Sequence, residues 1–192
     1  YTWYIKLSGV GEGTVITYEP SSVPSSITGA VLIGDARHIE IENIRFKTSK
    51  RTESNAKYMN GICISGDWWE HTYIHNCTFD GINGSCIAIG TDSAKTSSKV
   101  RDLKIAENTM INFNFSGIYV RNALKGVSVC DNYIKGKSDN YSGNNAMHIN
   151  MANTSDSFVN AIISQNFLYG DAYSIIVENG HFSNYILTDN FI

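Results

Sequence analysis

The chain has few prolines, few cysteines and no long apolar run. It contains only 2 Pro and 4 Cys in 192 residues. Cys63, Cys77, Cys86 and Cys130 form no C-x-x-C motif, which argues against a zinc ribbon or a thioredoxin-type site, so we predict a free, buried thiol at each. No apolar stretch approaches the roughly 20 residues that a membrane helix requires, so we expect no membrane insertion.

Charge is also sparse. Only 17% of the residues are charged, and the formal net charge is -3. Without a basic field, nucleic acid is not an expected partner. No acidic cluster has the spacing of an EF-hand or of a calcium-binding repeat, so the sequence gives no support for bound calcium, and we expect neither a metal ion nor a cofactor.

The sequence does contain a repeat. Pairs of large apolar residues, five positions apart, recur six times, and a polar tetrapeptide containing Asn fills each gap. The pairs are Ile41/Phe46, Ile74/Phe79, Ile105/Met110, Val129/Ile134, Ile163/Leu168 and Leu187/Ile192. Successive pairs begin 33, 31, 24, 34 and 24 residues apart. A short, variable period indicates one supersecondary unit repeated along the chain, with loops of different lengths.

Each repeat reads as short strands joined by a sharp corner. Residues alternate before each pair, as in Leu103-Lys104-Ile105, and a second alternating run such as Ile118-Tyr119-Val120 follows after a loop. No window shows a 3.6-residue apolar stripe, so we predict no substantial helix. Asn tolerates the left-handed backbone that a corner needs, and its amide can bond the Asn of the next repeat in a ladder of about 4.8 Å spacing.

This pattern resembles the right-handed parallel β-helix of the pectin-lyase-like superfamily. The stretch from Ile5 to Ile16, I-K-L-S-G-V-G-E-G-T-V-I, looks like the L-x-G-x-G-x-G-T-x-I stretch found early in the pectate-lyase and phage-tailspike branch. The resemblance implies an all-β fold: a single-stranded right-handed parallel β-helix (β-solenoid) of about six to seven rungs. Relatives place a strand and an N-terminal cap before that stretch. We therefore expect residues 1–192 to be a single β-helix segment of a longer protein, without its N-terminal cap and C-terminal continuation.

The second strands predict one candidate site. Aligning them gives an outward column of Leu32, Cys63, Ala88, Tyr119, His148 and Ile176. Two positions further on, a second column contains Gly34, Ser65, Gly90, Arg121, Asn150 and Glu178. The patch of Tyr119, Arg121, His148, Asn150 and Glu178 would bind an acidic sugar and move a proton. Much of the first column is small or apolar, which also fits a surface packed against a loop or another subunit.

The second candidate is the run Asp67-Trp68-Trp69-Glu70-His71, placed in the loop after Ile64. Adjacent tryptophans cannot both face the core. At least one is therefore expected to stack on a sugar ring or to lie at an interface with a neighbouring subunit. Asp92, on the adjacent rung, would complete a carboxylate pair with Asp67 or Glu70.

Motifs of the known enzyme families are absent. The sequence contains none of the N-T-D, D-D, G-H-G and R-I-K signatures of polygalacturonase-type hydrolases, the Asp-Pro-His-Asp tetrad of alginate epimerases or the Asp/His pattern of calcium-dependent pectate lyases. No catalytic residue is therefore carried over from a relative. Position and residue type alone predict catalytic roles for Asp67, Glu70, Asp92, His148 and Glu178, and substrate-binding roles for Trp68, Trp69, Tyr119, Arg121 and Asn150.

Two functions remain open from the sequence. The resemblance implies an extracellular protein (secreted, cell-surface or part of a virion tail) that binds a polysaccharide and cleaves its glycosidic bonds, as a hydrolase rather than a lyase. The alternative is a non-catalytic structural or receptor-binding module of a trimeric fibre or an adhesin. A homotrimer is expected in either case, since viral relatives are commonly trimers.

Overall fold

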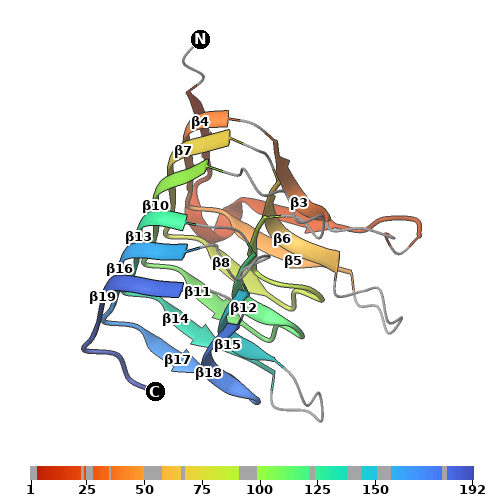
Figure 1. The fold of residues 1–192 in the computed structure, drawn as a ribbon. Helices are drawn as coiled ribbons and strands as arrows, with labels where there is room; N and C mark the ends of the chain where they lie inside the picture. The colour runs from red at the N-terminus through yellow and green to blue at the C-terminus, as the bar shows by residue number, and fades with distance from the viewer. Residues whose placement is uncertain are drawn as a thin grey trace.

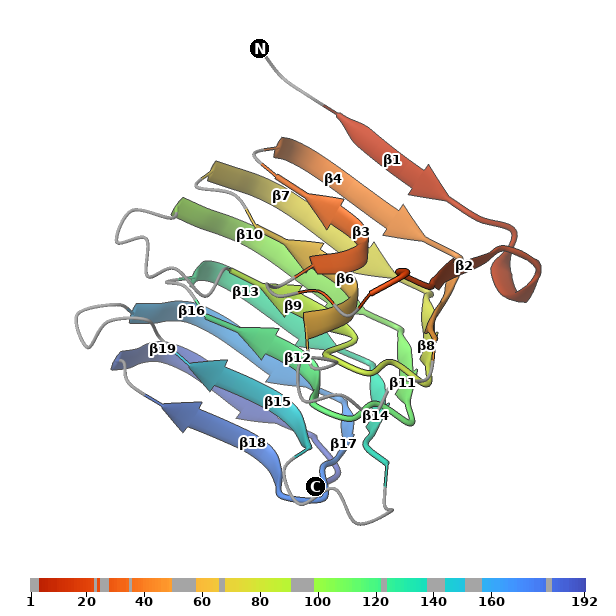
Figure 2. The same cartoon turned by 90° about the vertical axis from the view of Figure 1, so that its right-hand side faces the viewer.

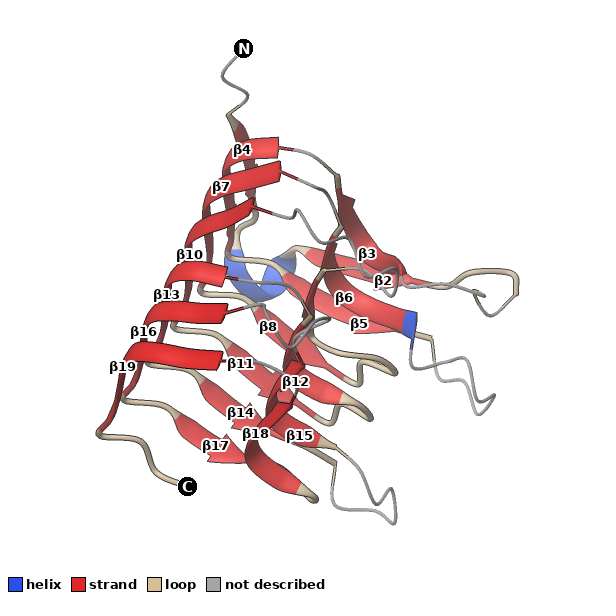
Figure 3. Ribbon diagram, viewed as in Figure 1, coloured by secondary structure: helices blue, strands red, loops and turns tan. Residues whose placement is uncertain are grey.

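The chain forms a parallel β-solenoid whose three sides are three parallel sheets (Figure 1). This computed structural model describes residues 4–22, 24, 28–34, 36–49, 58–65, 68–90, 99–121, 124–137, 144–150, 157–178 and 181–192. The predicted all-β class is confirmed: the described elements are strands apart from one short helical turn, η1 (Gly11–Gly13) (Figure 3). No helix among the described residues is long and apolar enough to cross a membrane.

Each of the first six coils contributes one strand to every sheet, and the seventh contributes β19 to sheet A. Sheet A consists of β1 (Ile5–Ser8), β4 (Ala36–Glu42), β7 (Trp68–His75), β10 (Lys99–Ala106), β13 (Leu124–Cys130), β16 (Ser157–Ser164) and β19 (His181–Thr188). Sheet B consists of β2 (Val15–Tyr18), β5 (Arg45–Thr48), β8 (Thr78–Asp80), β11 (Thr109–Ile111), β14 (Tyr133–Lys135) and β17 (Phe167–Tyr169). Sheet C consists of β3 (Thr28–Ile33), β6 (Met59–Ile64), β9 (Ile87–Ile89), β12 (Ser116–Val120), β15 (Asn145–Asn150) and β18 (Tyr173–Glu178).

A coil is one pass of the chain through sheets A, B and C in that order. Figure 2 shows sheet A strands stacked in sequence order from β1 to β19. All pairings between strands are parallel, for example β10 with β13 and β12 with β15. Because parallel neighbours lie about 4.8 Å apart, equivalent residues of successive coils form columns along the solenoid axis.

The repeated apolar pairs form the core. Ile74, Phe79, Ile105 and Met110 are fully buried, as are most members of the first five pairs. Phe46 and Phe79 stack at 5.0 Å between ring centroids, 14° from parallel. The last pair, Leu187 and Ile192, is 50% and 66% exposed, because no described coil packs on the outer side of β19.

At the corner between sheets A and B, two neighbouring residues share the two roles that we predicted for a single Asn, the left-handed backbone and the side-chain ladder. One residue per coil is left-handed, with φ between 52° and 58°: Asn43, Asn76, Glu107, Asp131, Gln165 and Asp189. Only the first two of these are Asn. In the four later coils Asn follows the left-handed residue and forms the ladder: Asn108, Asn132, Asn166 and Asn190. The predicted ladder is therefore present, but the predicted left-handed Asn is wrong for these four coils.

Sheet A contains a second left-handed column that the sequence did not predict. It consists of His38, His71, Asp102, Gly126, Asn160 and Asn184, with φ between 52° and 74°. The pairing register passes over these residues: Arg37 pairs with Glu70 and Ile39 with Thr72, leaving His38 and His71 unpaired in the ladder. Both partner strands skip one residue, so the pairing stays one to one, and the six strands from β4 to β19 bend together at the same place.

Candidate functional site

The register of sheet C confirms the predicted columns. Tyr119 pairs with His148, His148 with Ile176 and Asn150 with Glu178. The backbone N–H of Arg121 donates to the carbonyl of Ile89, which places Arg121 in the same column as Asn150. The five residues of the predicted patch therefore lie on three successive coils at the end of sheet C.

His148 and Glu178 form the centre of this patch. His148 Nε2 lies 3.0 Å from Glu178 Oε2, and Asn150 Nδ2 donates to the same oxygen at 2.9 Å. The His148 side chain is 12% exposed and that of Glu178 is 41% exposed. Because a carboxylate only accepts, the Nε2 of a neutral His148 carries the proton that binds Glu178, and Nδ1 keeps its lone pair.

Aromatic rings surround His148. Tyr119 meets it edge-on at 5.1 Å between ring centroids, and Phe115 lies 6.1 Å away. His148 Nδ1 is buried and has no hydrogen-bond partner. Arg121, in the next column, is half-buried. The patch thus combines a cation, a hydrogen-bonded imidazole–carboxylate pair and an aromatic wall.

The outward column is more covered than the sequence predicted. Cys63 and Ala88 have no exposed surface and Tyr119 is only 7% exposed, whereas Leu32 at the N-terminal end is 57% exposed. The apolar middle of the column is therefore already covered within the single chain, so a second subunit is not needed to bury it. Cys63, Cys77 and Cys86 are free and buried as predicted, and Cys130 is free and half-buried.

The tryptophan run lies in a strand and not in a loop. Trp68 and Trp69 are the first residues of β7, paired with Lys99 and Val100 of β10. The alternating strand begins immediately after the loop, so the run belongs to sheet A. The side chains of both tryptophans, and Asp67 and Asp92 entirely, lie outside the described residues.

Glu70 does not join the His148 patch. It lies in β7, paired with Arg37 of β4 on one side and with Arg101 of β10 on the other. β7 and β18 are three coils apart, which places Glu70 about 14 Å from Glu178 along the axis. The two carboxyl groups of glycosidases lie about 5 to 9.5 Å apart. Glu70 and Glu178 are therefore too distant to act as such a pair.

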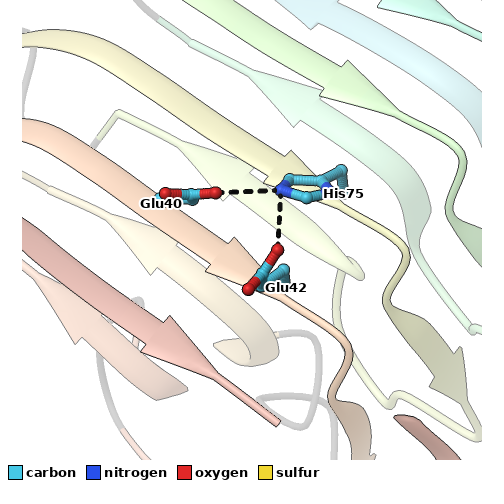
Figure 4. A group of neighbouring side chains, drawn as sticks. All are labelled: Glu40, Glu42 and His75. Atoms are coloured by element: carbon cyan, nitrogen blue, oxygen red, sulfur yellow. Dashed lines mark hydrogen bonds and ion pairs between the residues drawn. The ribbon is translucent and has the colours of Figure 1, made fainter. Parts of the chain in front are cut away.

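The structure brings together a cluster that the sequence did not predict. Glu40 and Glu42 of β4 point their carboxylates at the ring of His75, in the adjacent β7 (Figure 4). His75 Nε2 lies 3.4 Å from Glu40 Oε1 and 3.3 Å from Glu42 Oε2. The ring of Tyr73 stacks on His75 at 3.9 Å.

Lys6 and Ser8 of the edge strand β1, together with Tyr4 just before it, complete this cluster. Lys6 Nζ lies 3.1 Å from Glu40 Oε1 and 2.8 Å from Glu42 Oε1. Tyr4 donates its hydroxyl to Glu40 Oε2 at 2.6 Å, and Ser8 donates to Glu42 Oε1 at 2.7 Å. The hydrogen bonds from Tyr4 and Lys6 lower the pKa of Glu40 to about 2, and those from Lys6 and Ser8 lower the pKa of Glu42. The carboxylates are thus held ionised.

The sequence contained a usable signal for this cluster. Glu42 and His75 each directly follow the first member of a repeated apolar pair, Ile41 and Ile74, so they are equivalent positions of successive coils. Glu40 lies two positions earlier on the same face of the strand. The outward columns of sheet A therefore bring all three residues together, as the columns of sheet C bring together the His148 patch.

A polar cleft of about 360 Å³ lies where the sheet B strands end and the chain turns towards sheet C. Lys47, Asp80, Asn112, Asn114 and Lys137 line it. Asp80 accepts from Asn112 at 2.9 Å and pairs with Arg45 at 2.7 Å, and these two contacts lower its pKa. Amide groups with charges of both signs suit a hydroxyl-rich ligand.

Comparison of the chain with known proteins finds no matching family model, no similar curated protein and no similar solved structure.

Proposed function

We propose that the chain binds a polysaccharide across sheet C and cleaves its glycosidic bonds with the His148–Glu178 pair. The observation that carries the proposal is the 3.0 Å contact between His148 Nε2 and Glu178 Oε2 beside the rings of Tyr119 and Phe115. A partly exposed carboxylate that is held in place by an imidazole N–H can act as a general base, and aromatic faces pack against sugar rings.

Two features give a saccharide an extended surface. The polar cleft lies at the corner between sheets B and C, before the sheet C strands begin, and the His148–Glu178 pair lies towards the end of strands β15 and β18. A five-residue strand spans about 16 Å, enough for several sugar units. Arg121, beside Asn150 at the same end, suits the carboxylate of an acidic sugar.

In this mechanism Glu178 fixes the tautomer of His148 and stabilises its protonated form. Because His148 Nδ1 is buried, the group of the pair that reaches the substrate is the Glu178 carboxylate, which is 41% exposed. It takes a proton from the water that attacks the anomeric carbon as the glycosidic C–O bond breaks, and the departing sugar oxygen takes up a proton from solvent. Asn150 holds the same Glu178 oxygen, which orients the carboxylate towards the ring. The pectin-lyase-like resemblance supports this proposal and, with it, a tailspike-type depolymerase acting outside the cell as a homotrimer.

A non-catalytic fibre shaft is the second candidate. It is favoured by the continuous ladder of Asn108, Asn132 and Asn166, and by rings stacked on the outer face of sheet B, where Tyr133 and Phe167 are 4.7 Å apart and Phe167 and Phe191 are 5.2 Å apart. Ladders of this kind stiffen a solenoid and need no active site.

A polymer screen tests the proposal. The chain is incubated with bacterial capsular, lipopolysaccharide and plant uronate polymers, and bound glycan, new reducing ends and unsaturated products are recorded together. Reducing ends without unsaturation identify a hydrolase, and unsaturated product identifies a lyase. Binding without cleavage supports a receptor-binding fibre, and no binding to any polymer contradicts the carbohydrate proposal and favours the shaft.

Variants then test the residues. Glu178→Gln and His148→Gln should each lower the cleavage rate about 100-fold or more. Glu107→Gln is the matched control, since Glu107 is exposed at the corner between sheets A and B and Gln165 occupies the equivalent position. Full activity in both Glu178→Gln and His148→Gln would exclude the pair as the catalytic groups.

A further inference from the structure

We propose that Glu40, Glu42 and His75 form a binding site for a transition-metal ion such as Zn²⁺, and that Lys6 competes with the metal for this site. The site lies on the outer face of sheet A, on β4 and β7, whereas the His148 patch lies on sheet C, in later coils. The metal proposal does not rest on the carbohydrate proposal. Figure 4 shows the three side chains converging on one point between β4 and β7.

The spacing of the donor atoms fits a tetrahedral ion. Zn²⁺ binds imidazole nitrogen and carboxylate oxygen at about 2.0 to 2.2 Å, so the ligand atoms of a tetrahedral site lie about 3.4 Å from one another. His75 Nε2 is 3.4 Å from Glu40 Oε1 and 3.3 Å from Glu42 Oε2. The three donor atoms all lie within 4.8 Å of one another. Three protein ligands leave the fourth position for a water molecule.

Each ligand has an outer partner that holds it in place. Tyr4 donates to the second oxygen of Glu40 at 2.6 Å, and Ser8 donates to the second oxygen of Glu42 at 2.7 Å. The side-chain amide of Asn76 lies 3.0 Å from Nδ1 of His75. When Nε2 binds a metal, Nδ1 carries the proton. If the amide group of Asn76 is rotated, its oxygen accepts a hydrogen bond from that Nδ1–H. Such outer partners are typical of metal sites.

Lys6 is the competitor. Its ammonium lies 3.1 Å from Glu40 Oε1, one of the oxygens that would bind the metal, and 2.8 Å from Glu42 Oε1. The Lys6 side chain is 39% exposed and extends from the edge strand β1, so it can turn to solvent when a divalent ion enters. Two carboxylates and the ammonium of Lys6 leave one net negative charge. Two carboxylates and one divalent cation leave none, so the cation neutralises the site better than Lys6 does. The imidazole ligand favours Zn²⁺ over Mg²⁺ and Ca²⁺, which prefer oxygen.

Calorimetric titration with ZnCl2 near neutral pH tests the site. His75→Gln and Glu42→Gln should each weaken Zn²⁺ binding about 10-fold or more. Lys6→Met should bind Zn²⁺ about 10-fold more tightly than the unaltered chain, because it removes the competing charge and keeps the length of the side chain. A gain in affinity cannot result from a loss of folding. Mg²⁺ at the same concentration should not displace Zn²⁺.

Other histidines provide the control. His38 and His71 stack on one another at 4.7 Å, and His71 Nδ1 lies 3.3 Å from Asp102 Oδ2, so this second group offers imidazole nitrogens outside the proposed site. The double variant His38→Gln/His71→Gln should keep the proposed site intact. Co²⁺ in place of Zn²⁺ should give the visible absorption of a four-coordinate ion, and His75→Gln should abolish it. Equal Zn²⁺ affinity in the unaltered chain, His75→Gln and Lys6→Met would overturn the proposal.

Discussion

At the scale of single residues, the corner between sheets A and B shows how one local requirement is met in two ways. Glu107 and Asp131 adopt left-handed backbone although neither is the residue type that most favours it. The Asn that follows each of them compensates, because its side chain binds the backbone of the preceding coil and the Asn of the next one. The strain at one residue is therefore offset by the hydrogen bonds of its neighbour.

Asn132→Ala should remove about 2 to 4 kcal/mol of folding free energy. Asn132 Oδ1 accepts from the backbone N–H and the side-chain amide of Asn108, and its Nδ2 donates to the carbonyl of Ile105 and to Asn166 Oδ1. The alanine leaves several buried groups without partners, at about 1 to 3 kcal/mol each before relaxation. Urea unfolding measures the loss. Asn114→Ala, at a half-buried Asn whose amide lies 3.4 Å from Asn83 Oδ1, should cost less than about 1 kcal/mol, and equal losses would contradict the ladder's role.

Glu40 should make stability depend on pH in the acidic range. Hydrogen bonds from Tyr4 and Lys6 lower its pKa from an ordinary value of 4.5 to about 2. A carboxyl group with a lowered folded-state pKa stabilises the fold above its unfolded pKa, and this contribution is lost as pH falls from about 4.5 to about 2. The melting temperature of Glu40→Gln should therefore fall less steeply over that range. Glu19→Gln, at an exposed position, should follow the unaltered chain; a Glu40→Gln curve with the original slope would show that the Glu40 contacts do not form.

At the scale of elements, the strands of sheet C approach one another and the core so closely that some positions exclude any side chain. Gly61 of β6 is one of these. A Cβ there would lie 2.6 Å from the carbonyl oxygen of Cys86 and 2.7 Å from Cδ1 of Phe79. The first contact is with backbone, which cannot move without disturbing the neighbouring strand.

Gly61→Ala should therefore destabilise the fold by about 1 to 3 kcal/mol, the usual cost of overpacking. Gly34→Ala is the matched control, since a Cβ at Gly34 would have no atom within 4 Å. It should be neutral or slightly stabilising, because alanine reduces the freedom of the unfolded chain. Thermal unfolding of the two variants measures the difference. Similar melting temperatures would show that β6 can shift away from β9 without cost.

The repeat made most of the fold predictable, because strand alternation and the apolar pairs report directly which face is buried. It also gave the columns of sheet C, so the neighbours Tyr119, His148 and Glu178 followed from counting residues. The left-handed column in sheet A did have a signal, because all six of its residues are His, Asp, Gly or Asn, the types enriched in left-handed backbone. It was missed because each of these residues lies inside a run that reads as a continuous strand. The start of β7 was missed because Trp68-Trp69 breaks the alternation that marks the other strands.

At the scale of the whole molecule, both ends of the solenoid expose apolar side chains, since Ile5 of β1 is 45% exposed, but the charged residues gather beside β1. At β1 the outer face carries Lys6, Glu40 and Glu42, whose charges bind one another. At β19 the surface is apolar: Tyr185 is 56% exposed, and Leu187 is 50% exposed. Both belong to columns that are buried in the preceding coil, since they pair with Ala161 and Ile163. β19 pairs only with β16 among the described strands, which leaves its other edge open.

An open strand edge with apolar side chains promotes association, so we expect the 192-residue chain to self-associate through β19. Lysines directed inward on an edge strand prevent such pairing, so the double variant Tyr185→Lys/Leu187→Lys should shift sedimentation towards the monomer. Ile162→Lys/Ser128→Lys adds the same charge on the outer face of sheet A, away from that edge, and should sediment like the unaltered chain. Circular dichroism establishes that both variants keep their strands. If the outer-face variant dissociates and the edge variant does not, the subunits meet side by side along sheet A, which is the arrangement that the predicted homotrimer would use. A trimer insensitive to both variants would place the contact on sheet B or sheet C.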